Sequence, residues 1–104
     1  MTEDGPVTVR LMQTPGGERV VRVQVRSRTR PSSLMSGLLK AGELGTAAEA
    51  RKTVETLGGA LAERLIDVFG DTVDPDEMAR LAGRGWDELV EEARRAGQPP
   101  RTLN

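Results

Sequence analysis

Arginine recurs at even-numbered positions in the segment VRVQVRSRTRP, which runs from Val21 to Pro31 and contains Arg22, Arg26, Arg28 and Arg30. In a β-strand, residues of one parity share a face, so these side chains would lie opposite the alternating valines. Such a row of guanidinium groups could bind the phosphates of a nucleic acid, with an affinity that falls steeply with salt. The same row could instead be the solvated side of a strand, or could orient a protein partner.

Composition favours the solvated strand or the protein partner over nucleic acid. The chain of 104 residues has one Trp, one Phe and no Tyr, so it offers few aromatic rings on which bases could stack. Its net charge is −1, and it lacks the overall basic balance typical of nucleic-acid-binding domains. A nucleic-acid-binding ribbon stays open as the alternative.

The other residues capable of chemistry do not form a recognisable site. There is no Cys and no His, which excludes thiol nucleophiles, disulfides and imidazole bases or ligands. The four aspartates between positions 67 and 76 are out of register with a calcium-binding EF-hand loop. Glu91 and Glu92 would point to different sides of a helix, with no pocket to separate their pKa values. We therefore expect no enzyme, no metal, no cofactor and no small-molecule substrate.

A helix-turn-helix is a further possibility for the segment MARLAGRGWDELVEEARRAG, which begins at Met78. The spacing of Ala79, Gly83 and Leu89 superficially suits that motif. However, the second helix would present four carboxylates to the phosphates of DNA, which repel them at short range. Packed helices with a solvated acidic face are the preferred interpretation.

The elements that would position the arginines begin with a hairpin over residues 7–27. Val7, Val9 and Leu11 alternate with polar residues or Met12, and the alternation resumes from Arg19. Between the two runs, QTPGGE supplies the proline and glycines that turns favour. An isolated hairpin is marginally stable in water, so its valine face needs a cover.

Helical periodicity follows over residues 33–96. Leu34 with Leu38 and Met35 with Leu39 are spaced i,i+4, which predicts a short helix over Ser33–Ala41. The sequence TAAE at positions 46–49 has the form of a capping box and predicts the start of a longer helix. Gly58 and Gly59 in its middle indicate either a close approach of another backbone or a break between two helices.

A further helix start is predicted at Asp74, which would cap a helix whose first residue is Pro75. The sequence GRG at positions 83–85 predicts a division into two helices, and residues 97–104 are predicted to be a mobile tail. The predicted fold class is therefore α+β, with an N-terminal β-hairpin followed by three or four short α-helices in a single small domain, 1–104.

Apolar surface exceeds what so short a chain would cover by itself, and this predicts a protein partner or a homo-oligomer. The expected contact residues are Leu34, Leu38 and Leu39 together with the valines of the hairpin, with the arginine row orienting the partner. No run of about 18 apolar residues exists, so no membrane span is expected. The acidic N-terminus argues against a signal peptide, and the expected location is the cytoplasm.

One segment resembles a known family. Residues 30–44, RPSSLMSGLLKAGEL, follow a β-rich, arginine-bearing segment and resemble the small tail-assembly proteins of actinobacterial phages, in which an arginine-proline junction opens a leucine helix. Together with the arginine-bearing segment before it, the close resemblance covers roughly a quarter of the chain. It implies a non-catalytic chaperone or adaptor that binds tail components during assembly, with Arg30, Pro31, Leu34 and Leu38 at the junction.

Overall fold

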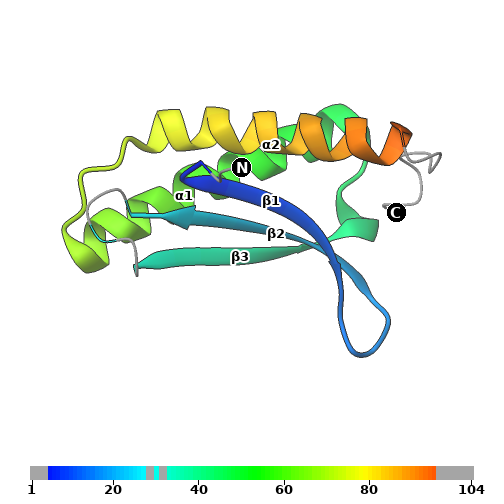
Figure 1. Ribbon diagram of the computed structural model, residues 1–104, viewed down its shortest axis with the longest axis horizontal. Coiled ribbons are helices and arrows are strands. Elements are labelled where there is room, and N and C mark those ends of the chain that lie inside the picture. The colour runs from blue at the N-terminus through cyan, green and yellow to red at the C-terminus, as the bar shows by residue number, and fades with distance from the viewer. Residues whose placement is uncertain (1–4, 28–29, 31–32, 96–104) are drawn as a thin grey trace.

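A computed structural model describes residues 5–27, 30 and 33–95 of the chain (Figure 1). The chain is α+β, as predicted, with three strands followed by two α-helices. The elements are β1 (Val7–Gln13), β2 (Arg19–Arg26), β3 (Leu34–Lys40), a 3₁₀ turn η1 (Ala41–Glu43), α1 (Ala47–Phe69) and α2 (Pro75–Arg95).

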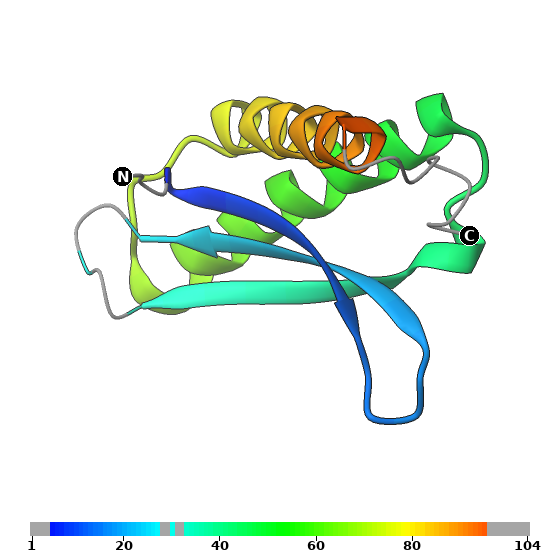
Figure 2. The same ribbon diagram turned by 45° about the vertical axis from the view of Figure 1, so that its right-hand side comes forward.

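The strands form one antiparallel sheet in the order β1-β2-β3, and both helices pack on the same face of it (Figures 1 and 2). α1 lies against β2 and β3, whereas α2 lies against β1. Val21, Val23 and Val25 of the central strand are fully buried beneath the helices. The predicted division of β2 into a valine side and an arginine side is therefore confirmed.

The hydrophobic core fills the space between the sheet and the helices and is almost entirely aliphatic. Trp86 is its one buried aromatic residue among the described positions. The helices contribute Val54, Leu65 and Met78, which are all fully buried. This core accounts for most of the aliphatic side chains that the sequence suggested would need an outside partner.

The segment predicted to be a helix over Ser33–Ala41 is strand β3, so that prediction was wrong. A spacing of i,i+4 is compatible with both structures, because residues four apart also share one face of a strand. Pairing with β3 satisfies the backbone groups on the second side of β2, which no helix would do. The region predicted as helical, 33–96, thus begins with a strand, and the structure has two α-helices instead of three or four.

The predicted break at Gly83–Gly85 is also absent, because α2 continues without interruption from Pro75 to Arg95. A Cβ atom at Gly85 would lie 2.8 Å from Cγ2 of Val9, which is too close for two carbon atoms. Glycine here allows α2 to approach β1, and the packing offsets its poor helix propensity.

Gly58 shows which of the two interpretations of the central glycines is correct. α1 is unbroken, and a Cβ atom at Gly58 would lie 2.7 Å from Cβ of Ala82 and 3.2 Å from the carbonyl oxygen of Met78. The glycine therefore permits close approach of the two helices and does not mark a break.

The helix starts predicted at Thr46 and Asp74 are confirmed. At α1, the Thr46 hydroxyl accepts a hydrogen bond from the Glu49 N–H (3.2 Å), and the Glu49 carboxylate accepts one from the Thr46 N–H (3.0 Å). At α2, the Asp74 carboxylate accepts a hydrogen bond from the Asp76 N–H (3.0 Å). Each cap satisfies backbone donors that have no partner within the first helical turn.

Hydrogen bonds and ion pairs between side chains also connect separate elements at two places. Arg51 of α1 donates from Nε to Asp87 of α2 (3.0 Å) and forms a further ion pair with Glu55. The hydrogen bond to Asp87 raises the pKa of Arg51, and the negative charges of Asp87 and Glu55 act in the same direction, whereas desolvation opposes them. At the other end of the molecule, the buried hydroxyl of Ser27, after β2, donates to the carboxylate of Asp71 between the helices.

Candidate functional site

The face of the sheet that points away from the helices carries most of the residues singled out by the sequence. We call it the Arg/Leu face. None of the described helices covers it (Figures 1 and 2). By strand alternation and register, its half-buried and exposed members are Thr8, Arg10, Met12, Arg22, Gln24, Arg26, Leu34, Ser36, Leu38 and Lys40.

Arginine and leucine lie side by side on this face. In the pairing of β2 with β3, Arg22 is directly opposite Leu38, and Arg26 is directly opposite Leu34. Leu38 is 61% exposed and Leu34 is 40% exposed, which is high for leucine in a sheet. Opposed residues have Cβ atoms only about 5 Å apart, so each leucine lies beside the aliphatic part of an arginine side chain. The face therefore combines apolar area with positive charge.

The structure brings together four of the eight predicted partner-binding residues: Arg22, Arg26, Leu34 and Leu38. All four lie on adjacent strands of one sheet, whereas the sequence had predicted the arginines in a hairpin and the leucines in a helix. Arg30 is exposed in the connection between β2 and β3, where its N–H donates to the Ser27 hydroxyl (2.8 Å). Arg28 and Pro31 lie outside the described residues.

Leu39, which was predicted to contact the partner together with Leu38, does not belong to this face. It has the opposite parity to Leu38, so it lies on the helix side of β3 and packs against the core. The prediction grouped the two leucines because adjacent residues of a helix can border one surface, whereas adjacent residues of a strand point to opposite faces.

Sequence reasoning missed three of the charged or large apolar residues of the Arg/Leu face: Arg10, Met12 and Lys40. Arg10 lies directly opposite Arg22, and Met12 is 40% exposed on the same strand. The hairpin itself contained the signal for Arg10, because the turn at residues 14–18 fixes which residues of the two strands are opposed. Lys40 could not be placed while its segment was interpreted as a helix.

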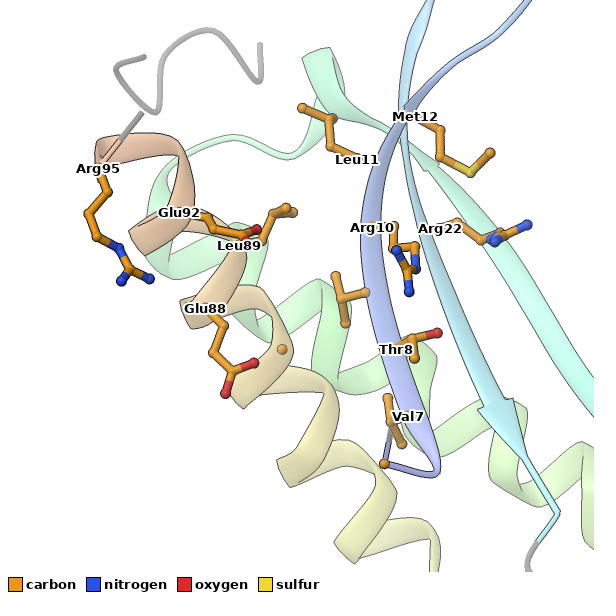
Figure 3. Close-up of a pocket in the computed structure, with 13 residues that line it drawn as sticks. Val7, Thr8, Arg10, Leu11, Met12, Arg22, Glu88, Leu89, Glu92 and Arg95 are labelled. Carbon is orange, nitrogen blue, oxygen red and sulfur yellow. The ribbon is translucent and has the colours of Figure 1, made fainter. Parts of the chain in front are cut away.

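A groove of about 730 Å³ runs along β1, between the edge of the sheet and α2 (Figure 3). Leu11 and Leu89 line its apolar part. Glu88 and Glu92 lie on α2 on one side of β1, whereas Arg10 and Arg22 lie on the other side of that strand. The carboxylates of Glu88 and Glu92 are thus separated by β1 from the guanidinium groups of Arg10 and Arg22, whereas Arg95 lies on α2 with the carboxylates. The groove offers a surface for binding that is apolar in part and charged in part.

The charged residues of the Arg/Leu face are all cations within the strands that the structure describes. Glu18 in the hairpin turn lies next to the face and pairs with Lys40 at 3.8 Å, with both side chains exposed. Among the described residues, no three acidic side chains gather where they could hold a metal ion. The chemistry available on this face is therefore that of guanidinium groups and aliphatic side chains.

Neither described helix has the combination of length and apolar character that crossing a bilayer requires. Comparison of the chain with protein-family models, with curated proteins and with solved structures found no match. The residues and geometry of the Arg/Leu face are therefore the basis on which a function can be inferred.

Proposed function

We propose that the protein is a non-enzymatic protein-interaction module, an adaptor or assembly protein, that binds its partner through the Arg/Leu face. The observation that supports this most strongly is the exposure of Leu34 and Leu38 beside two arginines on a sheet face that no described element covers. Interface cores combine apolar area with arginine, which is enriched there, whereas lysine is depleted.

The arrangement of charge supports the same proposal. Arg10 and Arg22 are directly opposed across β1 and β2, and like charges in this position destabilise a sheet. A partner with carboxylates facing these arginines would remove that repulsion and gain charge-assisted hydrogen bonds. The partner surface that fits is therefore apolar in part and acidic in part.

The resemblance of residues 30–44 to phage tail-assembly proteins suggests the process in which such a module would act. The partner would then be a tail component held during morphogenesis. Leu34 and Leu38, two of the residues that carry the resemblance, lie on the Arg/Leu face, although they belong to strand β3 and not to the leucine helix of that family. The resemblance therefore supports this contact region by its sequence and not by its secondary structure.

The proposal is tested by capturing partners from phage-infected host cells on the full chain and on two variants. Leu38→Glu replaces the most exposed leucine of the face with a charge and should weaken partner binding at least tenfold, because a buried leucine contact is lost and a carboxylate is desolvated. Arg84→Gln changes an exposed residue of α2 and serves as the control. Both variants should keep the wild-type unfolding temperature. A partner that binds Leu38→Glu as tightly as wild type would contradict the proposal.

A second candidate function is nucleic-acid binding by the same face. The observation in its favour is that the described strand residues of the face include four cations and no carboxylate: Arg10, Arg22, Arg26 and Lys40. Binding through phosphates would show a log affinity that falls with log salt by about 0.9 per contact on duplex DNA. Arg22→Gln with Arg26→Gln would then reduce this slope by about two, whereas Leu38→Glu would act chiefly through its added charge.

A further inference from the structure

Strand β3 forms an open edge of the sheet. Among the described strands it pairs only with β2, so its other side has no strand partner, whereas α2 runs alongside the opposite edge strand, β1 (Figures 1 and 2). α2 approaches β1 so closely that a Cβ atom at Gly85 would collide with Val9. The two edges of the sheet are therefore unequal, and β3 is the accessible one.

The backbone of β3 has groups directed away from the sheet. The Ser27 N–H donates a hydrogen bond to the Ser33 carbonyl oxygen (2.9 Å). This bond shows which of the opposed residue pairs of β2 and β3 are hydrogen-bonded to each other. Because bonded pairs alternate along an antiparallel ladder, Met35, Gly37 and Leu39 exchange hydrogen bonds with β2. The N–H and C=O groups of the even-numbered residues, Leu34, Ser36, Leu38 and Lys40, consequently point outward along the free edge.

This edge also lacks the features that normally prevent strand pairing. Proteins protect exposed edges with charged side chains, proline, bulges or a covering helix. From Leu34 to Leu39 the strand has no charge and no proline, and its register with β2 is regular throughout. An unprotected apolar edge of this length favours pairing with another strand.

We propose that the strand that pairs with β3 is β3 of a second copy, antiparallel to it about a two-fold axis at Ser36. The sequence LMSGL is symmetric about Ser36 in its outer residues, so this register places Leu34 of each copy opposite Leu38 of the other. The two exposed leucines of each edge thereby cover each other on the Arg/Leu face. The outward backbone groups of Leu34, Ser36 and Leu38 gain partners in the same step.

Charge on the neighbouring helix is arranged in a way that suits the two-fold axis. The side of α1 next to β3 begins with Lys52, which lines the same hollow as Leu39, the neighbour of Lys40 at the end of the strand. The same side of α1 carries Glu63, one turn beyond Ala60, and Asp67, one turn further along. One cation, Arg64, is next to Glu63 in the sequence. In an antiparallel pair, the basic end of each edge faces the acidic end of the other.

The resulting dimer would have one continuous six-stranded sheet with all four helices on the same side. Its two Arg/Leu faces would adjoin and form one larger surface. The inference goes beyond the proposed function and does not depend on it, because a dimer can form whether or not a further partner binds.

Light scattering coupled to size-exclusion chromatography of the full chain tests the inference. The expected mass is about 22 kDa, twice the 11.2 kDa of one chain. Leu34→Lys should convert the dimer to a monomer, whereas the matched control Met12→Lys should not, since Met12 is equally exposed, at 40%, but lies on β1. Ser36→Pro removes an outward N–H without removing a ladder hydrogen bond and should also give a monomer. Circular dichroism checks that each variant is folded.

A cysteine scan then tests the register. The chain has no cysteine, so any disulfide in a single-cysteine variant reports on the introduced position. Ser36→Cys lies on the proposed axis, where opposed Cα atoms are about 5.5 Å apart and within reach of a disulfide. It should form a covalent dimer on mild oxidation, at least tenfold faster than Lys40→Cys on the same edge.

Two results would overturn the inference. One is a wild-type chain that is monomeric at about 100 µM, and the other is a dimer that persists in both Leu34→Lys and Ser36→Pro. A dimer abolished by both substitutions but crosslinked faster at position 40 would overturn the register at Ser36. Leu38 belongs both to this edge and to the proposed partner surface, so Leu38→Glu alone does not separate the two proposals. Ser36→Pro separates them, because it removes an edge N–H and keeps the side chains of Leu34 and Leu38. Tail components that bind a monomeric Ser36→Pro variant support the proposed function independently of the dimer, and a wild-type dimer that binds no tail component contradicts the proposed function alone.

Discussion

Glycines at the contact between the helices show how single residues set the distance between elements. Gly58 faces Ala82 and the backbone of Met78, so even one added methyl group would have no room. Gly59, its neighbour in α1, has more space, because a Cβ atom there would lie 3.5 Å from the Pro75 carbonyl oxygen and make ordinary contact. Two adjacent glycines with the same helix propensity thus have different structural roles.

Alanine substitutions should separate these roles. We expect Gly58→Ala to lower the free energy of unfolding by about 1–3 kcal/mol, because the helices must move apart to accept the methyl group. Gly59→Ala should raise it by about 0.5–1 kcal/mol, because alanine is the better helix former and meets no clash. Urea denaturation followed by circular dichroism measures both. Equal effects of the two substitutions would show that α1 and α2 do not pack as described.

The structural role of a residue could be predicted from the sequence where interactions between near neighbours in the chain determine it. The parity of Arg22 and Arg26, the caps at Thr46 and Asp74, and the hairpin turn all follow from interactions within a few positions. The roles of Gly58 and Gly85 could not be deduced, because they depend on which distant segment packs against them. The exposed Met12 likewise became recognisable only once the outer face was assembled.

At the scale of elements, β3 was the main feature that sequence reasoning misjudged. Its apolar residues lie on both faces of the strand, so LMSGLL lacks the alternation of polar and apolar residues that identifies a half-buried strand. The leucines on its outer side are the reason, and they are also the residues to which we assign binding. The same surface that is proposed to function in binding therefore obscured the secondary structure.

The capping interaction at the start of α1 should contribute measurably to stability. Thr46→Ala removes the hydroxyl that caps the Glu49 N–H and should lower the free energy of unfolding by about 0.5–2 kcal/mol. Thr56→Ala, at an exposed position inside the same helix, should leave stability unchanged or raise it by a few tenths of a kcal/mol. Thermal unfolding monitored by circular dichroism compares them, and a larger loss for Thr56→Ala would contradict the assigned cap.

For the molecule as a whole, sheet and helices share one core in which Trp86 is buried among aliphatic residues. Neither the sheet nor the helices can therefore unfold without exposing the apolar side chains of the other layer. We expect the unfolding curves from Trp86 fluorescence and from far-ultraviolet circular dichroism to coincide at each protein concentration. Separate midpoints for the two signals would indicate that the sheet and the helices lose their structure independently.

The hairpin turn between β1 and β2 offers a practical route to studying such a small protein. Its backbone is closed by hydrogen bonds from the Thr14 N–H to the Glu18 carbonyl and from the Gly17 N–H back to the Thr14 carbonyl, both 2.8 Å. Pro15 and Gly16 at its tip are exposed, and the tip projects beyond the helices (Figure 2). An affinity peptide or a peptide that binds a fluorophore, inserted between these two residues, would leave β3 and both helices unaltered, so the labelled protein could be followed inside cells.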